Sequence, residues 1–126
     1  MITDMSFVPV SGAFATAPIE EFVSRLPHTR RDVADPATFI VAPDQDTLAS
    51  AVSLRETDTN NFPTNVTLVS IYPHRIDLAY RLEPLEAGRT FVAWLRDHYQ
   101  VRICDEESND VTASVDPGLV YLFGAP

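Results

Sequence analysis

The sequence predicts an α+β domain in which helices pack against an antiparallel sheet. Three observations favour this class: short runs of β-formers recur along the 126 residues, residues 75–83 alternate between apolar and polar side chains, and three segments carry apolar side chains at helical spacing. From Thr38 onward, the predicted order is β-α-β-β-α-β, the split β-α-β or ferredoxin-like plan with helices on one face of the sheet. An N-terminal helix before this unit and a C-terminal strand after it complete the expected single domain, residues 1–126.

The N-terminal region is expected to contain an arm and a helix. Residues 1–15 are mostly small and apolar and are predicted to form a loosely ordered arm with a short strand at Ser6–Val10. A helix is predicted over residues 16–27, TAPIEEFVSRLP, because Pro18 suits a first helical turn and Pro27 ends the helix. Its apolar side chains recur at i, i+3, i+4 and i+7 and form one stripe: Ile19, Phe22, Val23 and Leu26.

The next segment is expected to supply a loop, a strand and a second helix. HTRRDVADPA, at 28–37, is polar and rich in turn formers, whereas ATFIVAP, at 37–43, is a short apolar run of β-formers. The helix is predicted to start after Asp44, whose carboxylate suits the N-cap, and to run to Glu56. One face of this helix carries Leu48, Ala51, Val52 and Arg55.

A β-hairpin is the clearest signal in the chain. Residues 66–72 are rich in β-formers, and Pro73 and His74 mark a tight connection to residues 75–83. The second half alternates with period two, which is typical of an antiparallel strand with one packed side and one wet side. The packed side is expected to carry Ile76, Leu78, Tyr80 and Leu82, and the wet side Arg75, Asp77, Arg81 and Glu83.

The C-terminal third is expected to hold a third helix and two strands. AGRTFVAWLRDHYQ, at 87–100, places its aromatic residues at helical spacing, which indicates an amphipathic helix whose stripe packs in the core. VRIC, at 101–104, is a short predicted strand, and GLVYLF, at 118–123, is the last one. The helical stripe consists of Phe91, Trp94, Leu95, His98 and Tyr99.

The charge balance limits the range of partners. The chain has 18 acidic and 9 basic residues, the latter all arginine, and a net charge of −9. This charge repels nucleic acids and anionic membranes and favours a basic protein partner. The single cysteine excludes an intramolecular disulfide, and neither a signal peptide nor an apolar run of membrane-spanning length is recognisable. We therefore expect a cytoplasmic domain, and the all-arginine basic set indicates a GC-rich, bacterial genome.

Residue types with catalytic or metal-binding chemistry are present, but their spacing argues against such a site. The three histidines are far apart on separate predicted elements, and the acidic segment after Cys104 lacks the ligand spacing of a calcium loop. Three acids follow Cys104, and their negative field disfavours the reactive thiolate. Asp97 and His98 are neighbours on a helix and point in different directions. We therefore expect no catalytic residue, no metal and no cofactor, and we do not expect an enzyme.

The acidic segment is the best candidate for binding a partner. We expect a small inhibitor of the immunity-protein or antitoxin type, which acts as a monomer or homodimer and neutralises a basic toxin by direct binding. An acidic surface would mimic the phosphates that a nuclease toxin binds and would speed association by electrostatic steering. The residues expected to contact the partner are Asp105, Glu106, Glu107, Asp110 and Asp116.

Two other functions fit the sequence. The first is a small-molecule-binding regulatory domain or a small enzyme that uses the open face of the sheet or a dimer cleft, where Arg75, Asp77 and Arg81 would form a mixed-charge platform. Cross-strand pairing of these charges on a wet face is the simpler interpretation of the same residues. The second is a structural or assembly accessory subunit.

Overall fold

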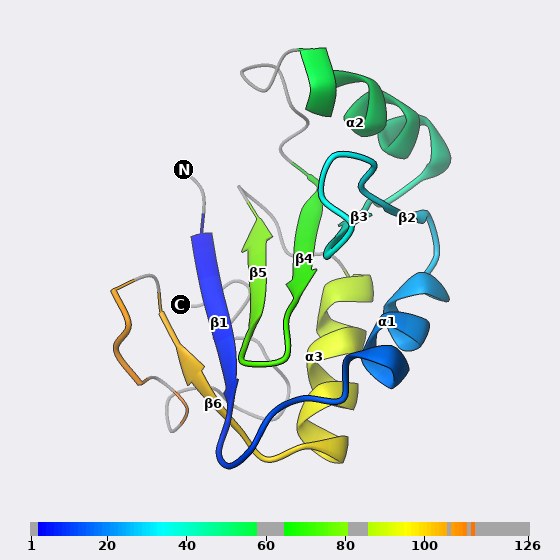
Figure 1. Ribbon diagram of the computed structural model, residues 1–126. Coiled ribbons are helices and arrows are strands. Elements are labelled where there is room, and N and C mark those ends of the chain that lie inside the picture. The colour runs from blue at the N-terminus through cyan, green and yellow to red at the C-terminus, as the bar shows by residue number, and fades with distance from the viewer. Residues whose placement is uncertain (1–2, 58–64, 81–85, 106, 111, 113–126) are drawn as a thin grey trace.

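The computed structural model describes residues 3–57, 65–80, 86–105, 107–110 and 112. Within these ranges the chain forms one sheet and three helices (Figure 1), which confirms the predicted α+β class. The predicted strand at 118–123 lies outside the described residues. In chain order the elements are β1 (Thr3–Pro9), α1 (Thr16–Ser24), β2 (Thr29–Arg31), β3 (Thr38–Val41), α2 (Gln45–Thr57), β4 (Thr67–Ile71), β5 (Ile76–Tyr80), α3 (Glu86–His98) and β6 (Val101–Cys104).

Strand β1 lies inside the sheet. The strand order is β2-β3-β4-β5-β1-β6, and every pair of neighbours is antiparallel. Ser6 of β1 lies opposite Asp77 of β5 on one side and Cys104 of β6 on the other. The segment expected to be a loosely ordered arm with a strand at 6–10 therefore contributes a seven-residue strand, which Figure 1 shows between β5 and β6.

The ferredoxin-like order is not confirmed. In the split β-α-β plan, strands joined by a helix run parallel with another strand between them. Strands β3 and β4 are joined by α2 but are direct antiparallel neighbours. Strands β5 and β6, joined by α3, do have a strand between them, and that strand is β1. The plan therefore does not describe β3-α2-β4, and it describes β5-α3-β6 only with β1, which precedes Thr38, as the strand between them.

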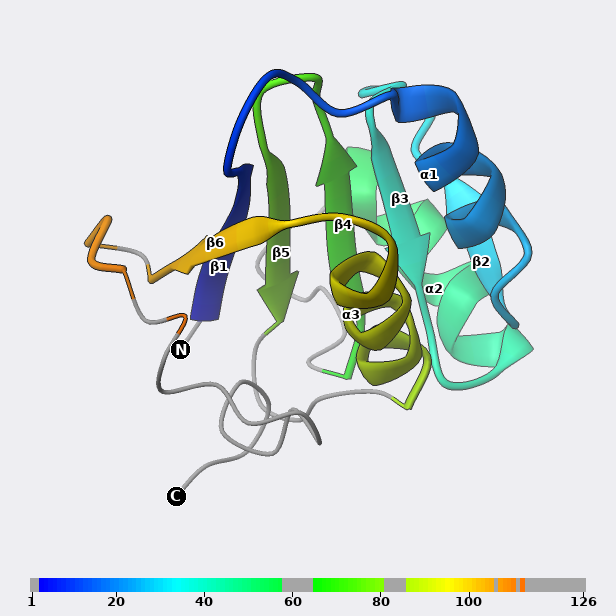
Figure 2. The ribbon, with the colours of Figure 1, turned by 90° about the horizontal axis from the view of Figure 1, so that it is seen from below.

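The helices cover both faces of the sheet. Helices α1 and α3 lie side by side on one face, and α2 packs against the opposite face (Figure 2). The expectation that the helices share one face is therefore wrong for α2. The physical reason lies in β3, because all four of its residues are buried and such a strand needs cover on both sides. Its continuous apolar run was the signal for this arrangement.

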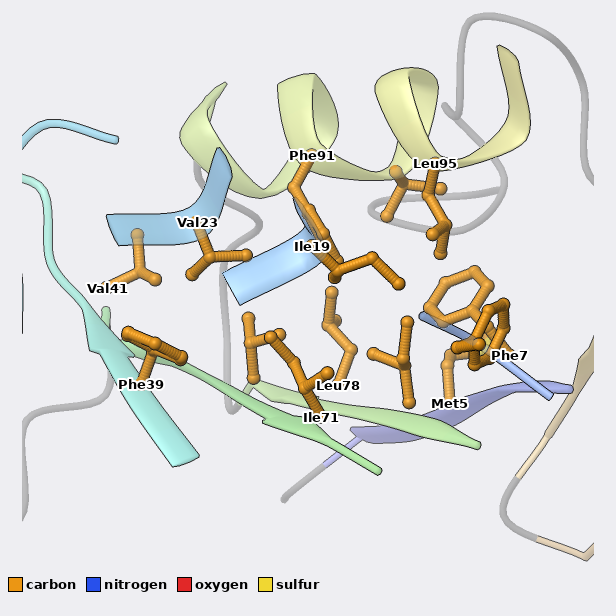
Figure 3. Packing of buried hydrophobic residues seen from close by; sticks show 14 of the residues in the cluster. Met5, Phe7, Ile19, Val23, Phe39, Val41, Ile71, Leu78, Phe91 and Leu95 are labelled. Carbon is orange, nitrogen blue, oxygen red and sulfur yellow. The ribbon is translucent and has the colours of Figure 1, made fainter. Parts of the chain in front are cut away.

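The main core fills the space between the sheet and helices α1 and α3 (Figure 3). Ile19 of α1 and Phe91 and Leu95 of α3 meet side chains from every strand except β2, and all three helical side chains are fully buried. Each fully buried side chain of this size contributes roughly 1.5–3 kcal/mol relative to an exposed one. A smaller cluster on the opposite face packs α2 against β3 and the start of β4: Ile40, Ala42, Leu48, Ala51 and Val66.

Local signals place most elements where they were predicted. Asp44 caps α2, because its Oδ1 accepts a hydrogen bond of 2.7 Å from the backbone N–H of Thr47. Strands β4 and β5 form the predicted hairpin, closed by the backbone N–H of Tyr72, which donates to the carbonyl oxygen of Arg75 at 2.9 Å. Strand β2 was missed: it is three residues long and lies within the segment expected to be a polar loop.

We expect Phe7→Ala to lower the free energy of unfolding by about 3–5 kcal/mol, because Phe7 is fully buried under α3 in an internal strand. Val10→Ala, one residue beyond β1 at a side chain that is 52% exposed, is the matched control and should change it by less than about 0.5 kcal/mol. Urea denaturation of both variants measures the difference. Equal effects of the two substitutions would show that residues 3–9 are not integral to the sheet.

Candidate functional site

The acidic segment forms a closed turn at the edge of the sheet. After β6 the chain reverses, and the backbone N–H of Asp105 donates to the carbonyl oxygen of Asn109 at 3.0 Å. The N–H of Ser108 donates to the carbonyl oxygen of Asp105, also at 3.0 Å, and Ser108 has a left-handed backbone with φ of 66°. Cys104 and Asp110 then pair as an isolated antiparallel bridge. We call the described residues of this turn, 105 and 107–110, the acidic loop.

The carboxylate of Asp105 organises the acidic loop from within. Its Oδ1 accepts hydrogen bonds of 2.9 Å from the backbone N–H groups of Glu107 and Asn109. The bond from Asn109, followed by the bond from Glu107, holds the pKa of the Asp105 carboxyl below its ordinary value of 3.8. Asp105 is thus both a structural residue of the turn and a fixed negative charge.

Asp110 ties the end of the acidic loop to β6. Its Oδ1 accepts hydrogen bonds from the hydroxyl of Thr112 at 2.6 Å and from the backbone N–H of Thr112 at 3.0 Å. The same hydroxyl oxygen accepts a bond of 2.8 Å from the backbone N–H of Ile103 in β6. The two bonds from Thr112 lower the pKa of the Asp110 carboxyl, to which the charge of Arg102 adds.

The structure brings together three of the five residues expected to contact a partner. Asp105 and Asp110 hold the acidic loop in shape, and the side chain of Glu107 is exposed between them. Glu106 and Asp116 lie outside the described residues. The sequence revealed the charges of this loop, but the hydrogen bonds that fix its shape depend on the turn and were not predicted.

Two residues of the mixed-charge platform, Arg75 and Asp77, are described, and they bind each other. The carboxylate of Asp77 accepts hydrogen bonds from Nε of Arg75 at 3.1 Å and from the hydroxyl of Ser6 at 2.8 Å. The guanidinium of Arg75 also lies over the ring of Tyr72, 5.9 Å from its centroid. Arg81 lies outside the described residues. Arg75 and Asp77 are two residues apart in the chain, so their ion pair does not cross between strands, whereas the bond from Ser6 to Asp77 joins β1 to β5.

A polar row crosses the same face of the sheet and continues towards α2. The hydroxyls of Thr38 and Ser70 lie 2.7 Å apart. Asp32 follows β2, donates its backbone N–H to the carbonyl oxygen of Thr38 at 2.8 Å and is 4% exposed. Asp32 Oδ2 receives a hydrogen bond of 2.7 Å from Nε of Arg55 on α2. This ion pair fastens α2 to the sheet. Asp32 was missed because the sequence places it in a polar loop, with no sign that the loop is covered.

His98 contacts Trp94, one helical turn earlier on α3. Its ring stacks on Trp94, with centroids 4.6 Å apart, and its Nδ1 lies 2.8 Å from the carbonyl oxygen of Trp94. Trp94 also stacks on Phe22 of α1, with centroids 4.4 Å apart. The aromatic stripe predicted for this helix therefore joins α1 to α3, as core packing requires.

The fold and the acidic loop together define an α+β domain that carries a preorganised negative turn on an edge strand. No protein-family model matches the chain, and comparisons with curated proteins and with solved structures find no match. Within the described ranges, no group of three or more His, Cys, Asp or Glu side chains is arranged to hold a metal ion. None of the helices described is long and apolar enough to cross a membrane.

We expect the acidic loop to open at low pH. Because the folded-state pKa of Asp105 and of Asp110 is lowered, their stabilisation is complete above the ordinary value of 3.8 and is lost as the pH falls through the lower folded-state pKa. Amide hydrogen exchange at Glu107 and Asn109, measured between pH 6 and about pH 2, should show loss of protection only below pH 3.8.

The variant Asp105→Asn isolates the contribution of this carboxyl. The Asn side chain keeps an acceptor oxygen but does not titrate, so the pH dependence of exchange at Asn109 should be reduced. Asp97→Asn, on α3, is the control and should leave the wild-type profile unchanged. A profile that does not change in Asp105→Asn would contradict the assignment of Asp105 as the organiser of the loop.

Proposed function

We propose that this chain is a small acidic protein-binding domain that inhibits a basic protein partner, in the manner of an immunity protein or antitoxin. The observation that carries the proposal is the acidic loop, in which two carboxylates with lowered pKa values are held by hydrogen bonds directly after the outermost described strand, β6. A bacterial cytoplasmic location is part of the proposal, and the single cysteine supports it, since disulfides are rare in that compartment.

The distribution of ion pairs supports this choice of surface. Four arginines are paired with acids elsewhere: Arg25 with Glu21, Arg31 with Glu20, Arg55 with Asp32, and Arg75 with Asp77. Among the described residues, no ion pair involves an acid of the acidic loop. The negative charge of this turn is therefore available to a basic partner, and the net charge of −9 acts in the same direction.

The geometry of the acidic loop also suits rapid and specific binding. A turn that is already closed by its own hydrogen bonds loses less conformational entropy when a partner docks. Fixed charges at the rim of an interface mainly raise the association rate and do so more strongly at low salt. An inhibitor that must reach a toxin before it acts benefits from this property.

The open-face alternative has less support from the structure. Its two described charges, Arg75 and Asp77, bind each other and their neighbours. The role of a structural or assembly subunit stays open as an expectation from the sequence.

The proposal is tested by identifying the partner and measuring its association rate. Affinity capture from the native host, with and without the neighbouring gene product, should recover a basic protein. Glu107→Gln should then slow association at low salt by about two- to five-fold, the effect of one surface ion pair. Stopped-flow or surface-based kinetics at low and high salt would measure the rates.

Asp97→Asn is the matched control, because it removes one negative charge from α3 and leaves the acidic loop intact. We expect it to change the association rate much less than Glu107→Gln does. Equal rates for the wild type and Glu107→Gln at low salt, or capture of an acidic partner, would refute the proposed role of the loop.

A further inference from the structure

A hollow lies at one end of the sheet, far along the chain from the acidic loop. Its volume is about 380 Å³, within the range of small ligand sites. It is lined by the segment that follows α1, the segment that follows β3 and the start of α3. Its apolar floor is formed by the buried Ala42 and the half-buried Leu26 and Ala87. The exposed residues His28 and Glu86 stand at its rim.

The walls of the hollow are held in place by the backbone. Pro27 and Pro43, both in the lining, restrict the chain on either side of the hollow. His28 has a left-handed backbone with φ of 52°, an uncommon conformation for a residue other than glycine. Its carbonyl oxygen accepts a hydrogen bond of 3.0 Å from the backbone N–H of Ala42, which joins two of the walls. The hollow is therefore preformed.

The polar groups at the rim favour a positive ligand. Glu86 lies in the first turn of α3, where a carboxylate is stabilised by the helix dipole, and no ion pair with a described residue neutralises it. The hydroxyl of Thr90 is occupied, because it donates to the carbonyl oxygen of Glu86 at 3.0 Å.

We propose that this hollow binds the side chain of a lysine from the basic protein partner. The aliphatic stem would lie on Leu26, Ala42 and Ala87, and the ammonium group would meet the carboxylate of Glu86. A long apolar stem that ends in a cation matches an apolar floor with a carboxylate at the rim. This inference rests on the proposed function, since the lysine belongs to the inhibited partner, but it concerns a surface other than the acidic loop.

The test uses two small probes on the full chain without a partner. N-butylammonium chloride represents the lysine side chain alone, and Nα-acetyl-lysine methylamide adds the peptide backbone. Both are titrated into ¹⁵N-labelled protein at millimolar concentration, and we expect saturable amide shifts at His28, Ala42 and Ala87. N-butanol, which has no charge, should bind about five-fold more weakly.

Two variants locate the binding site. Glu86→Gln should weaken both cationic probes by about three- to five-fold, and Ala87→Leu should abolish the shifts by filling the floor. Glu107→Gln, in the acidic loop, removes the same charge and is the control, which should bind both probes like the wild type. Urea denaturation confirms that each variant is folded.

Three results would overturn the proposal: no saturable shift with either cationic probe, equal affinities of the wild type and Glu86→Gln, or binding of n-butylammonium without binding of the lysine derivative. The last would indicate a free small amine instead of a protein side chain. These outcomes are independent of the kinetics of Glu107→Gln, so failure at the hollow and failure at the acidic loop are distinguishable.

Discussion

The structure depends on the pairing of β1 with β5 and β6 at the same time. The apolar side chains of β1, Met5 and Phe7, fill the core beneath α3, while its Ser6 binds Asp77 on the other face. Without β1, strands β5 and β6 would have no hydrogen-bonded connection, because neither pairs with the other. The acidic loop follows β6 directly, so its position also depends on this N-terminal strand.

Local structure was predictable wherever a short segment carried its own signal. The stripe of α1 from Ile19 to Val23, the cap at Asp44 and the hairpin turn around Pro73 were predicted, because each depends on neighbours in the sequence. Helix α1 ends at Ser24, three residues before the predicted stop at Pro27. The position of β1 in the sheet was not predicted, since an isolated run of apolar residues does not indicate which strands it will pair with. The unbroken apolar run of β3 indicated that this strand is buried on both faces. Such burial requires cover on the second face, and α2 provides it.

The candidate sites also combine features that the sequence predicts with features that only the fold creates. The charges of Asp105, Glu107 and Asp110 were evident in the sequence, whereas the role of Asp105 as the centre of a hydrogen-bonded turn required the backbone geometry. The hollow had no sequence signal, because Leu26, Ala42 and Ala87 are ordinary apolar residues that only the tertiary fold brings together. Glu86 lies in the first turn of α3, a position that the helix dipole favours for any acid.

The internal place of β1 has a consequence for synthesis of the chain. Ser6 and Asp77 are 71 positions apart, so at 5–20 residues per second the ribosome delivers the partner strand roughly 4–14 s after β1 has been made. During this interval an apolar strand with two unpaired edges waits in the nascent chain, exposed to aggregation and to chaperones. Strand β1 is therefore made before the other described strands, but it can pair on both edges only after β5 and β6 have been made.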